Sequence, residues 1–235
     1  MRRVGAVTAV VVLAGGLAAA ATFAAQSPKS LRTSIFNAAR GERSVHYVTQ
    51  TAGNGAVVIV ADVGRTRGIQ RIRYATGGKV GHVTVIVANG TAYVHGDAFT
   101  LHGFLGFSQA QAARYANVWI RVPSRSHLYA AVADAVTLPS FLTEIYPRTD
   151  LARVTKKLNG VTVVGVRGLT KHQGIPFVEA VYTRVGGRPL PVGEVEATAG
   201  AAFRSTTAID RWNEKLHIGI PEHAVTFVGS AGKTA

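Results

Sequence analysis

Apolar and polar residues alternate along most of the chain after residue 43, and this period of two is the pattern of half-buried β-strands. Asn89-Gly90 and Gly186-Gly187 separate such runs, and both pairs are typical of tight hairpin turns. The pattern therefore predicts a meander of antiparallel strands. The predicted strands are 44–51, 56–63, 68–75, 81–88, 91–95, 118–122, 161–169, 177–185, 190–197 and 203–212.

Three segments follow a helical period instead. Residues 31–40 place Leu31, Ile35, Phe36 and Ala39 on one face, residues 108–115 are rich in Ala and Gln, and helix formers return in 128–145. Because one face of a sheet must be buried, helices in the middle of a long meander are expected to fill the concave side of a curled sheet. The predicted fold class is α+β: a curved antiparallel sheet of about ten strands, an incomplete β-barrel, wrapped around a few helices.

The N-terminus has the pattern of an export segment. Arg2 and Arg3 precede an uncharged apolar run over 4–25. Two interpretations stay open, a cleaved signal peptide and a retained N-terminal membrane anchor, and both place the folded part outside the cytoplasm. With 235 residues, the chain is expected to hold one half-barrel domain over 26–228, after the segment 1–25 and before a disordered tail at 229–235.

Composition narrows the range of partners. The chain has 26 Lys and Arg against 12 Asp and Glu, and a formal net charge of +14. For an exported domain this favours lipid and anionic membrane surfaces or wall polymers over nucleic acid. The basic residues are dispersed, so a solvated surface is the simpler interpretation of any single cluster. The absence of cysteine excludes disulfides, thiol chemistry and a lipid-modified N-terminal cysteine.

No catalytic, metal or cofactor site is predicted. The sequence contains no Gly-x-Ser-x-Gly elbow, and its eight histidines lack the spacing of a zinc-binding helix. Glu194 and Glu196 share one strand face and would suit an acid and base pair. Surface glutamates in ion pairs with arginines are the simpler interpretation of these two residues.

Several short motifs resemble one family of proteins. They are the hairpin around Asn89-Gly90, the segments 118–123 and 158–161, the Pro-containing segment 188–192, and a closing strand that ends at Trp212. Together they are similar to the actinobacterial LppX/LprAFG lipoproteins within the LolA-like lipid and lipoprotein carriers, over roughly residues 31–225. The resemblance implies a curved half-barrel over helices, an apolar cavity, and carriage of acylated lipids. Those lipoproteins carry an acylated cysteine after the signal, which this chain lacks.

Two apolar groups are the candidate ligand-binding residues. The first is a glycine-broken loop, which serves either as a core plug or as a lid at a cavity mouth. The second is an apolar stripe at i, i+3, i+4 and i+7. We expect both groups to line or gate an acyl-chain cavity. The residues are Phe99, Leu101, Phe104, Leu105 and Phe107 in the loop, and Leu138, Phe141, Leu142 and Ile145 in the stripe.

Three function classes remain open. The first is a non-enzymatic lipid-binding protein for lipid transport or trafficking in the cell envelope. The second is a non-catalytic scaffold or surface-binding module for anionic membranes or wall polymers, and the third and weakest is an envelope hydrolase. A continuous apolar cavity of several hundred Å³ favours the first class, and a filled core favours the second.

Overall fold

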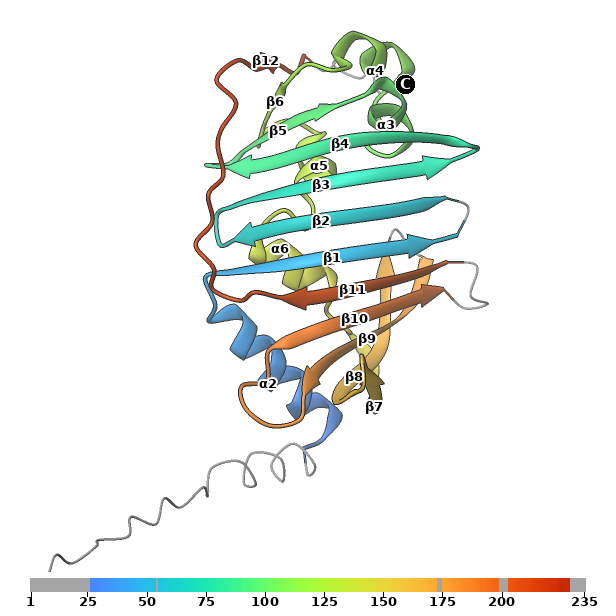
Figure 1. Ribbon diagram of the computed structural model, residues 1–235, viewed down its shortest axis with the longest axis vertical. Helices are drawn as coiled ribbons and strands as arrows, with labels where there is room; N and C mark the ends of the chain where they lie inside the picture. Colours follow the sequence, from blue (N-terminus) through green and yellow to red (C-terminus); the bar gives the residue numbers. More distant parts are fainter. Residues whose placement is uncertain (1–25, 54, 173–174, 199–202, 229–235) are drawn as a thin grey trace, which may run out of the picture.

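The computed structural model describes residues 26–53, 55–172, 175–198 and 203–228. The predicted export segment 1–25 and the tail 229–235 lie outside these residues. The described strands form one sheet in the order β12-β6-β5-β4-β3-β2-β1-β11-β10-β9-β8-β7 (Figure 1). All neighbours pair antiparallel except β12 and β6, which pair parallel. The α+β prediction of an open, curved antiparallel sheet around helices is confirmed.

The strands are β1 (Ser44–Ala52), β2 (Ala56–Gly64), β3 (Arg67–Thr76), β4 (Lys79–Ala88), β5 (Thr91–Gly96), β6 (Ile120–Pro123), β7 (Thr149–Leu158), β8 (Val161–His172), β9 (Ile175–Arg184), β10 (Pro191–Thr198), β11 (Arg204–Asp210) and β12 (Val225–Thr226). The helices are α2 (Pro28–Arg40), α3 (Ala98–Gly103), α4 (Gln109–Tyr115), α5 (Tyr129–Ala133) and α6 (Leu138–Glu144). Among the described residues, no helix combines the length and apolar character needed to cross a membrane.

The sheet has two more strands than the sequence pattern predicts. Strand β7 lies at one edge, and most of its residues are half-buried or exposed, so its apolar alternation is weak. Strand β12 has only two residues and pairs with β6. Helix α3 was also not expected, and it begins where the Asp97 side chain accepts a hydrogen bond from the Thr100 N–H.

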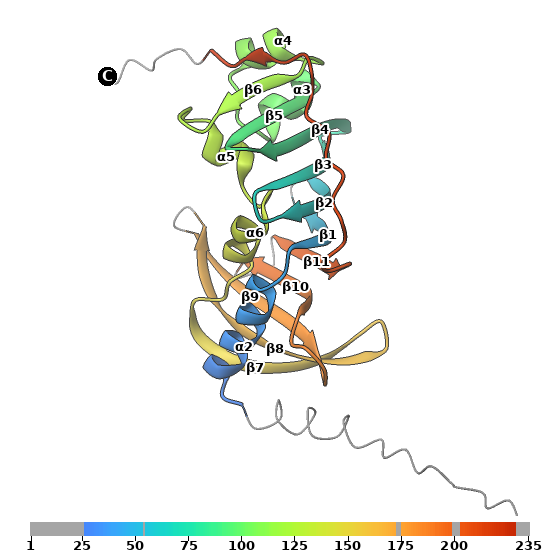
Figure 2. The same cartoon turned by 90° about the vertical axis from the view of Figure 1, so that its left-hand side faces the viewer.

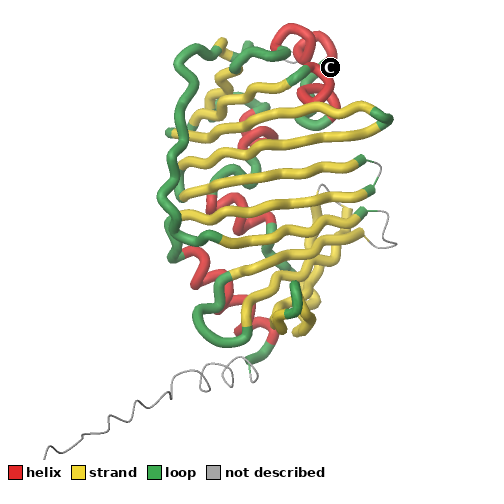
Figure 3. Tube along the Cα trace, in the orientation of Figure 1, coloured by secondary structure: helices red, strands yellow, loops and turns green. Residues whose placement is uncertain are grey.

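The helices divide between the concave side of the sheet and one end of the molecule. In the side view, α5 and α6 lie on one side of the sheet, and the strands from β10 to β7 curl beneath α2 and α6 (Figure 2). Helices α3 and α4 lie beside β4 to β6 at the other end (Figure 3). The expectation that helices occupy the concave side holds for α2, α5 and α6.

Two buried clusters fill the concave side. The lower core contains the apolar face of α2, the stripe of α6, and side chains from β1, β2, β8, β9 and β11. The upper core joins β3 to β6 with α3, α4 and α5, and includes Phe227 near the end of the described chain. Half-buried Ile59 on β2 packs against both cores. Helix α6 therefore belongs to the lower core, and the predicted loop 99–107 belongs to the upper core.

Gly68 permits the connection between α5 and α6 to pass closely over the sheet, between the two cores. A Cβ atom added at Gly68 on β3 would lie 1.8 Å from the Val136 carbonyl oxygen. This contact places the connection between α5 and α6 directly on the backbone of β3. Helix α6 thus starts from a fixed point on the sheet.

Candidate functional site

Helix α6 is short, and its position is set by local hydrogen bonds and by one aromatic contact. Thr137 and Ser140 form a capping box at its start, which satisfies backbone donors that a helix would otherwise leave free. The Phe141 ring stacks on Tyr47 of β1 with a centroid distance of 4.2 Å and an interplanar angle of 6°. The Tyr47 hydroxyl donates to the Ala135 carbonyl oxygen at 2.9 Å and accepts from Gln70 at 2.5 Å. The helix is therefore tied to β1 and β3.

The apolar stripe of α6 faces two separate recesses. Leu138 and Leu142 line a groove that opens to solvent, here called the outer groove, with a volume of about 630 Å³. Phe141 and Ile145 line a recess between α6 and the sheet that is open to a similar degree, here called the inner cavity, with a volume of about 290 Å³. Both volumes are on the scale of small-molecule sites, and the inner cavity is at the lower end of that scale.

The outer groove has an apolar floor and a basic rim. Pro139 and the Tyr146 ring extend the floor beside the two leucines, and Arg40, Arg65 and Arg148 stand around it. Within the described part of the chain, none of these three arginines pairs with a carboxylate, so their charges are available to an anionic ligand group.

Two of the rim arginines are held in place by neutral partners. Arg65 donates to the carbonyl oxygens of Gly41 and Glu42, just after α2 ends, at 2.9 and 3.0 Å. The Arg40 guanidinium lies 5.9 Å from the centroid of the Tyr146 ring. Carbonyls at a helix C-terminus and an aromatic face both attract cations without neutralising them. Arg40 and Arg65 are thus held in place without a bound ligand.

The inner cavity has an apolar wall and an acidic wall. Phe141 and Ile145 form the apolar wall from α6, together with Ile59 of β2 and the ring pair Phe177 and Phe203. The acidic wall comes from adjacent positions of β9, β10 and β11, where Glu196 pairs with Glu179 and Glu194 pairs with Thr207. Cavity-facing carboxyl groups are Glu179, Glu194, Glu196 and Glu144.

Burial changes the protonation of this acidic wall. Glu179 is 1% exposed, and burial, reinforced by the neighbouring carboxylates Glu194, Glu196 and Glu144, raises its pKa to about 10. Glu194 is 6% exposed, and burial raises its pKa to about 8, although Thr207 donates to its Oε2 at 2.8 Å. Both groups are therefore predominantly protonated at neutral pH.

The interpretation of Glu194 as a surface glutamate in an ion pair is wrong. Its face of β10 points to the concave side, because Glu194 lies opposite the buried Val181 of β9. Glu179 was missed altogether. The sequence does contain a signal for Glu179. It lies two residues before Val181 in an alternating strand, so it shares the buried face, where an apolar side chain is expected.

The structure separates the two groups of predicted ligand-binding residues. The α6 stripe lines the two recesses as described above. In the loop group, Leu101, Leu105 and Phe107 are buried in the upper core, and Phe99 and Phe104 are half-buried against Tyr74, with ring centroids 5.3 and 5.7 Å from its own. None of the five lines either recess. A lid role for this segment stays a prediction.

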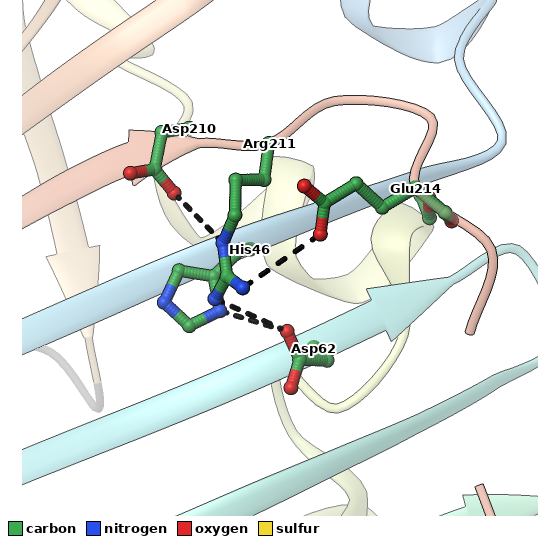
Figure 4. Close-up of polar contacts among 6 residues, drawn as sticks. His46, Asp62, Asp210, Arg211 and Glu214 are labelled. Atoms are coloured by element: carbon green, nitrogen blue, oxygen red, sulfur yellow. Dashed lines mark hydrogen bonds and ion pairs between the residues drawn. The ribbon is translucent and has the colours of Figure 1, made fainter. Parts of the chain in front are cut away.

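A polar cluster on the opposite face of the sheet is a separate feature (Figure 4). His46 Nδ1 lies 2.7 Å from Asp62 Oδ1, and Arg211 lies 3.7 Å from the carboxylates of Asp62, Asp210 and Glu214. These contacts join β1 and β2 to the segment after β11. The Ser44 hydroxyl donates to the backbone carbonyl oxygen of Glu214 at 2.6 Å. The described residues contain no group of His, Asp and Glu side chains suited to a metal ion.

Comparison with known proteins supports a shared fold. No protein-family model matches the sequence, and no curated protein matches it. The chain is similar to the crystal structure of LprF from Mycobacterium bovis, with a TM-score of 0.54 and 12% identity over 83% of this chain and 96% of that one. It also matches lipoprotein LppX from Mycobacterium tuberculosis, with a TM-score of 0.48 and 15% identity over 82% and 100% of the two chains. The resemblance predicted from the short motifs is confirmed at the level of the fold, and the chain shares the fold of LprF.

Proposed function

We propose that this chain is an extracytoplasmic lipid-binding protein that carries an acylated, anionic lipid in the cell envelope. The observation that carries the proposal is the outer groove, where an apolar floor from α6 meets three arginines that have no carboxylate partner among the described residues. An acyl chain suits the floor, and a phosphate or carboxylate head group suits the rim. The uncharged apolar run over 4–25 supports export, and the net charge of +14 supports contact with anionic membrane surfaces.

Burial of the lipid's acyl chain in the groove provides most of the binding free energy in this proposal. Each methylene transferred from water to an apolar site contributes about 0.8 kcal/mol. Two methylenes therefore correspond to about a tenfold change in the dissociation constant. The arginines add a salt-dependent contribution, because their side chains are exposed to solvent. No chemical step is part of the proposed function.

The first experiment identifies the cargo. The full chain is purified from its native host without detergent, extracted with organic solvent, and the extract is analysed by mass spectrometry. A stoichiometric acylated lipid with an anionic head group is the expected result. Absence of lipid from the extract, together with no binding of fatty acid in solution, would favour the alternative of an envelope scaffold or surface-binding module.

The second experiment places the ligand in the groove. Binding of cis-parinaric acid, a fluorescent fatty acid, is measured for the variant Thr143→Trp. Thr143 is an exposed residue of the groove, and a tryptophan there is large enough to displace part of the bound acyl chain. We expect affinity to fall at least about tenfold, as for the loss of two methylenes. Thr33→Trp on the exposed side of α2 is the matched control and should bind as the unmodified chain does.

A charge reversal tests the rim. Arg148→Glu should weaken binding of the fatty acid and reduce its salt dependence, whereas Arg71→Glu, on the outer face of β3, should leave both unchanged. Equal effects of the two reversals would mean that only overall charge attracts the ligand, and the rim assignment would be abandoned.

A further inference from the structure

The acidic wall of the inner cavity is not used by the proposed function. Both carboxyl oxygens of Glu179 and the Oε1 atom of Glu194 are buried and have no hydrogen-bond partner among the residues that the structure describes. Buried polar groups in folded proteins are nearly always satisfied, so three unsatisfied oxygens that line one cavity call for a partner outside the chain. These oxygens lie across α6 from the outer groove.

The surroundings of these oxygens are strongly acidic. Glu196 of β10 lies directly opposite Glu179, and Glu144 of α6 lines the same cavity. Arg148 lowers the pKa of Glu179 and Lys156 lowers that of Glu194 through their positive charges. Among the described residues, neither cation lines the cavity or forms an ion pair with Glu179 or Glu194. No lysine, arginine or histidine is among the described residues that line this cavity. In their ionised form Glu179 and Glu194 are therefore complementary to a positive charge.

The spacing suits a small cation with several donors. Glu179 and Glu194 are diagonal neighbours on β9 and β10, a relation in which Cβ atoms lie about 7 Å apart and long side chains converge. A group that donates charge-assisted hydrogen bonds of about 2.8 Å bridges two such carboxylates. The described carboxylates do not group closely enough to ligate a metal ion. An ammonium group has three donors, equal in number to the three unsatisfied oxygens.

We propose that the inner cavity binds the primary ammonium group of an amphiphilic amine, with the apolar chain of the amine against Phe141, Ile145 and Ile59. The acidic wall receives the three N–H donors, and the aromatic pair Phe177 and Phe203 borders the same cavity. The site is distinct from the outer groove, so the inference goes beyond the proposed function and does not depend on it.

Protonation gives this site a defined pH dependence. In the empty cavity burial keeps the pKa of Glu194 at about 8 and that of Glu179 at about 10, so both carry protons at neutral pH. A bound ammonium favours the ionised carboxylates, and binding therefore releases protons. Affinity then rises with pH by about tenfold per pH unit for each proton released. An alkylamine keeps its charge over this range, as lysine does.

The experiment compares three ligands of one chain length. Octylamine, octanol and octanoate are titrated into the full chain by isothermal calorimetry between pH 6.5 and 8.5, in two buffers with different heats of ionisation. We expect octylamine to bind at least tenfold tighter than octanol at pH 8, with proton release that the buffer comparison reveals. The preference for the amine should grow with pH.

Variants separate this site from the outer groove. The double substitution Glu179→Gln and Glu194→Gln preserves side-chain size and should abolish the preference for octylamine and the proton release, while octanol binding remains. Glu222→Gln, at an exposed carboxylate, is the matched control. Thr143→Trp should weaken octanoate binding and leave octylamine binding unchanged.

Two outcomes would overturn the inference. One is equal affinity for octylamine and octanol in the unmodified chain, including the case in which neither binds. The other is an amine preference that survives in the double variant. A loss of octanoate binding alone would count against the proposed function and leave the amine site standing, because the two ligands are assigned to opposite sides of α6.

Discussion

Replacement of Glu179 by glutamine should stabilise the protein, and the gain should grow with pH. Glu179 stays protonated in the folded chain because burial raises its pKa to about 10, whereas the ordinary value in an unfolded chain is 4.5. Above pH 4.5 the unfolded state is stabilised because it releases this proton, whereas the folded state keeps it. The free energy of unfolding therefore falls as pH rises towards the pKa of the folded state. Glutamine carries no ionisable proton, and the substitution removes this loss.

The magnitude at pH 7 follows from the unfolded state alone. Since the folded group is still protonated at pH 7, the loss is the 2.5 pH units between 4.5 and 7 multiplied by about 1.4 kcal/mol per unit, or about 3–4 kcal/mol. This is a large part of the 5–15 kcal/mol or so that stabilises typical domains. At pH 4 the gain should be close to zero, because both states are then largely protonated.

Urea unfolding at pH 5, 6, 7 and 8 measures the effect. The difference in free energy of unfolding between Glu179→Gln and the unmodified chain should increase by about 1.4 kcal/mol per pH unit across this range. Glu222→Gln at an exposed position should change stability by less than about 0.5 kcal/mol at every pH. Parallel stability curves for Glu179→Gln and the unmodified chain would refute the assignment of a buried, protonated carboxyl group.

Three further substitutions test the framework around the site. Gly68→Ala should destabilise the fold by about 1–3 kcal/mol in urea unfolding, because its Cβ would overlap the Val136 carbonyl, and unchanged stability would contradict the close crossing described here. Leu101→Ala should cost about 2–5 kcal/mol of upper-core packing without weakening fatty-acid binding, and a selective loss of binding would instead support the lid role. Asp62→Asn removes the carboxylate partner of His46 and should slightly lower the midpoint temperature of thermal unfolding, with a smaller effect in high salt. A loss of ligand binding would instead assign that cluster a direct role.

The strands were predictable where one face is buried and the turns are tight. At Asn89-Gly90 both residues have positive φ, as the hairpin prediction requires. Asn159-Gly160 has the same geometry and connects β7 to β8, so the missed strand β7 had a readable turn signal. Its alternation is weak because this edge strand buries neither face fully. Strand β12 leaves no such signal, since two residues cannot define a period.

The site was predictable only in part. The α6 stripe is visible in sequence because helical spacing identifies one apolar face, but spacing does not show that Phe141 and Leu142 face different recesses. The acidic wall depends on the register of β9 with β10, in which Glu179 lies opposite Glu196, and on the packing of α6, which adds Glu144 to the same cavity. Arg40 and Arg148 line one groove only because tertiary packing brings the end of α2 beside Tyr146. Pairings of this kind are fixed by the fold rather than by local pattern.

The pairing of β1 with β11 governs the order in which the molecule can assemble. Tyr47 of β1 has its register partner, Ile209, near the end of the chain, while β2 to β5 pair through consecutive hairpins (Figure 1). A chain that emerges gradually from a ribosome or a translocation channel can form these hairpins early. The lower core cannot be completed until β11 is available, because Ile209 of β11 is part of it. Resistance to proteolysis should therefore appear late, when the C-terminal quarter has been delivered.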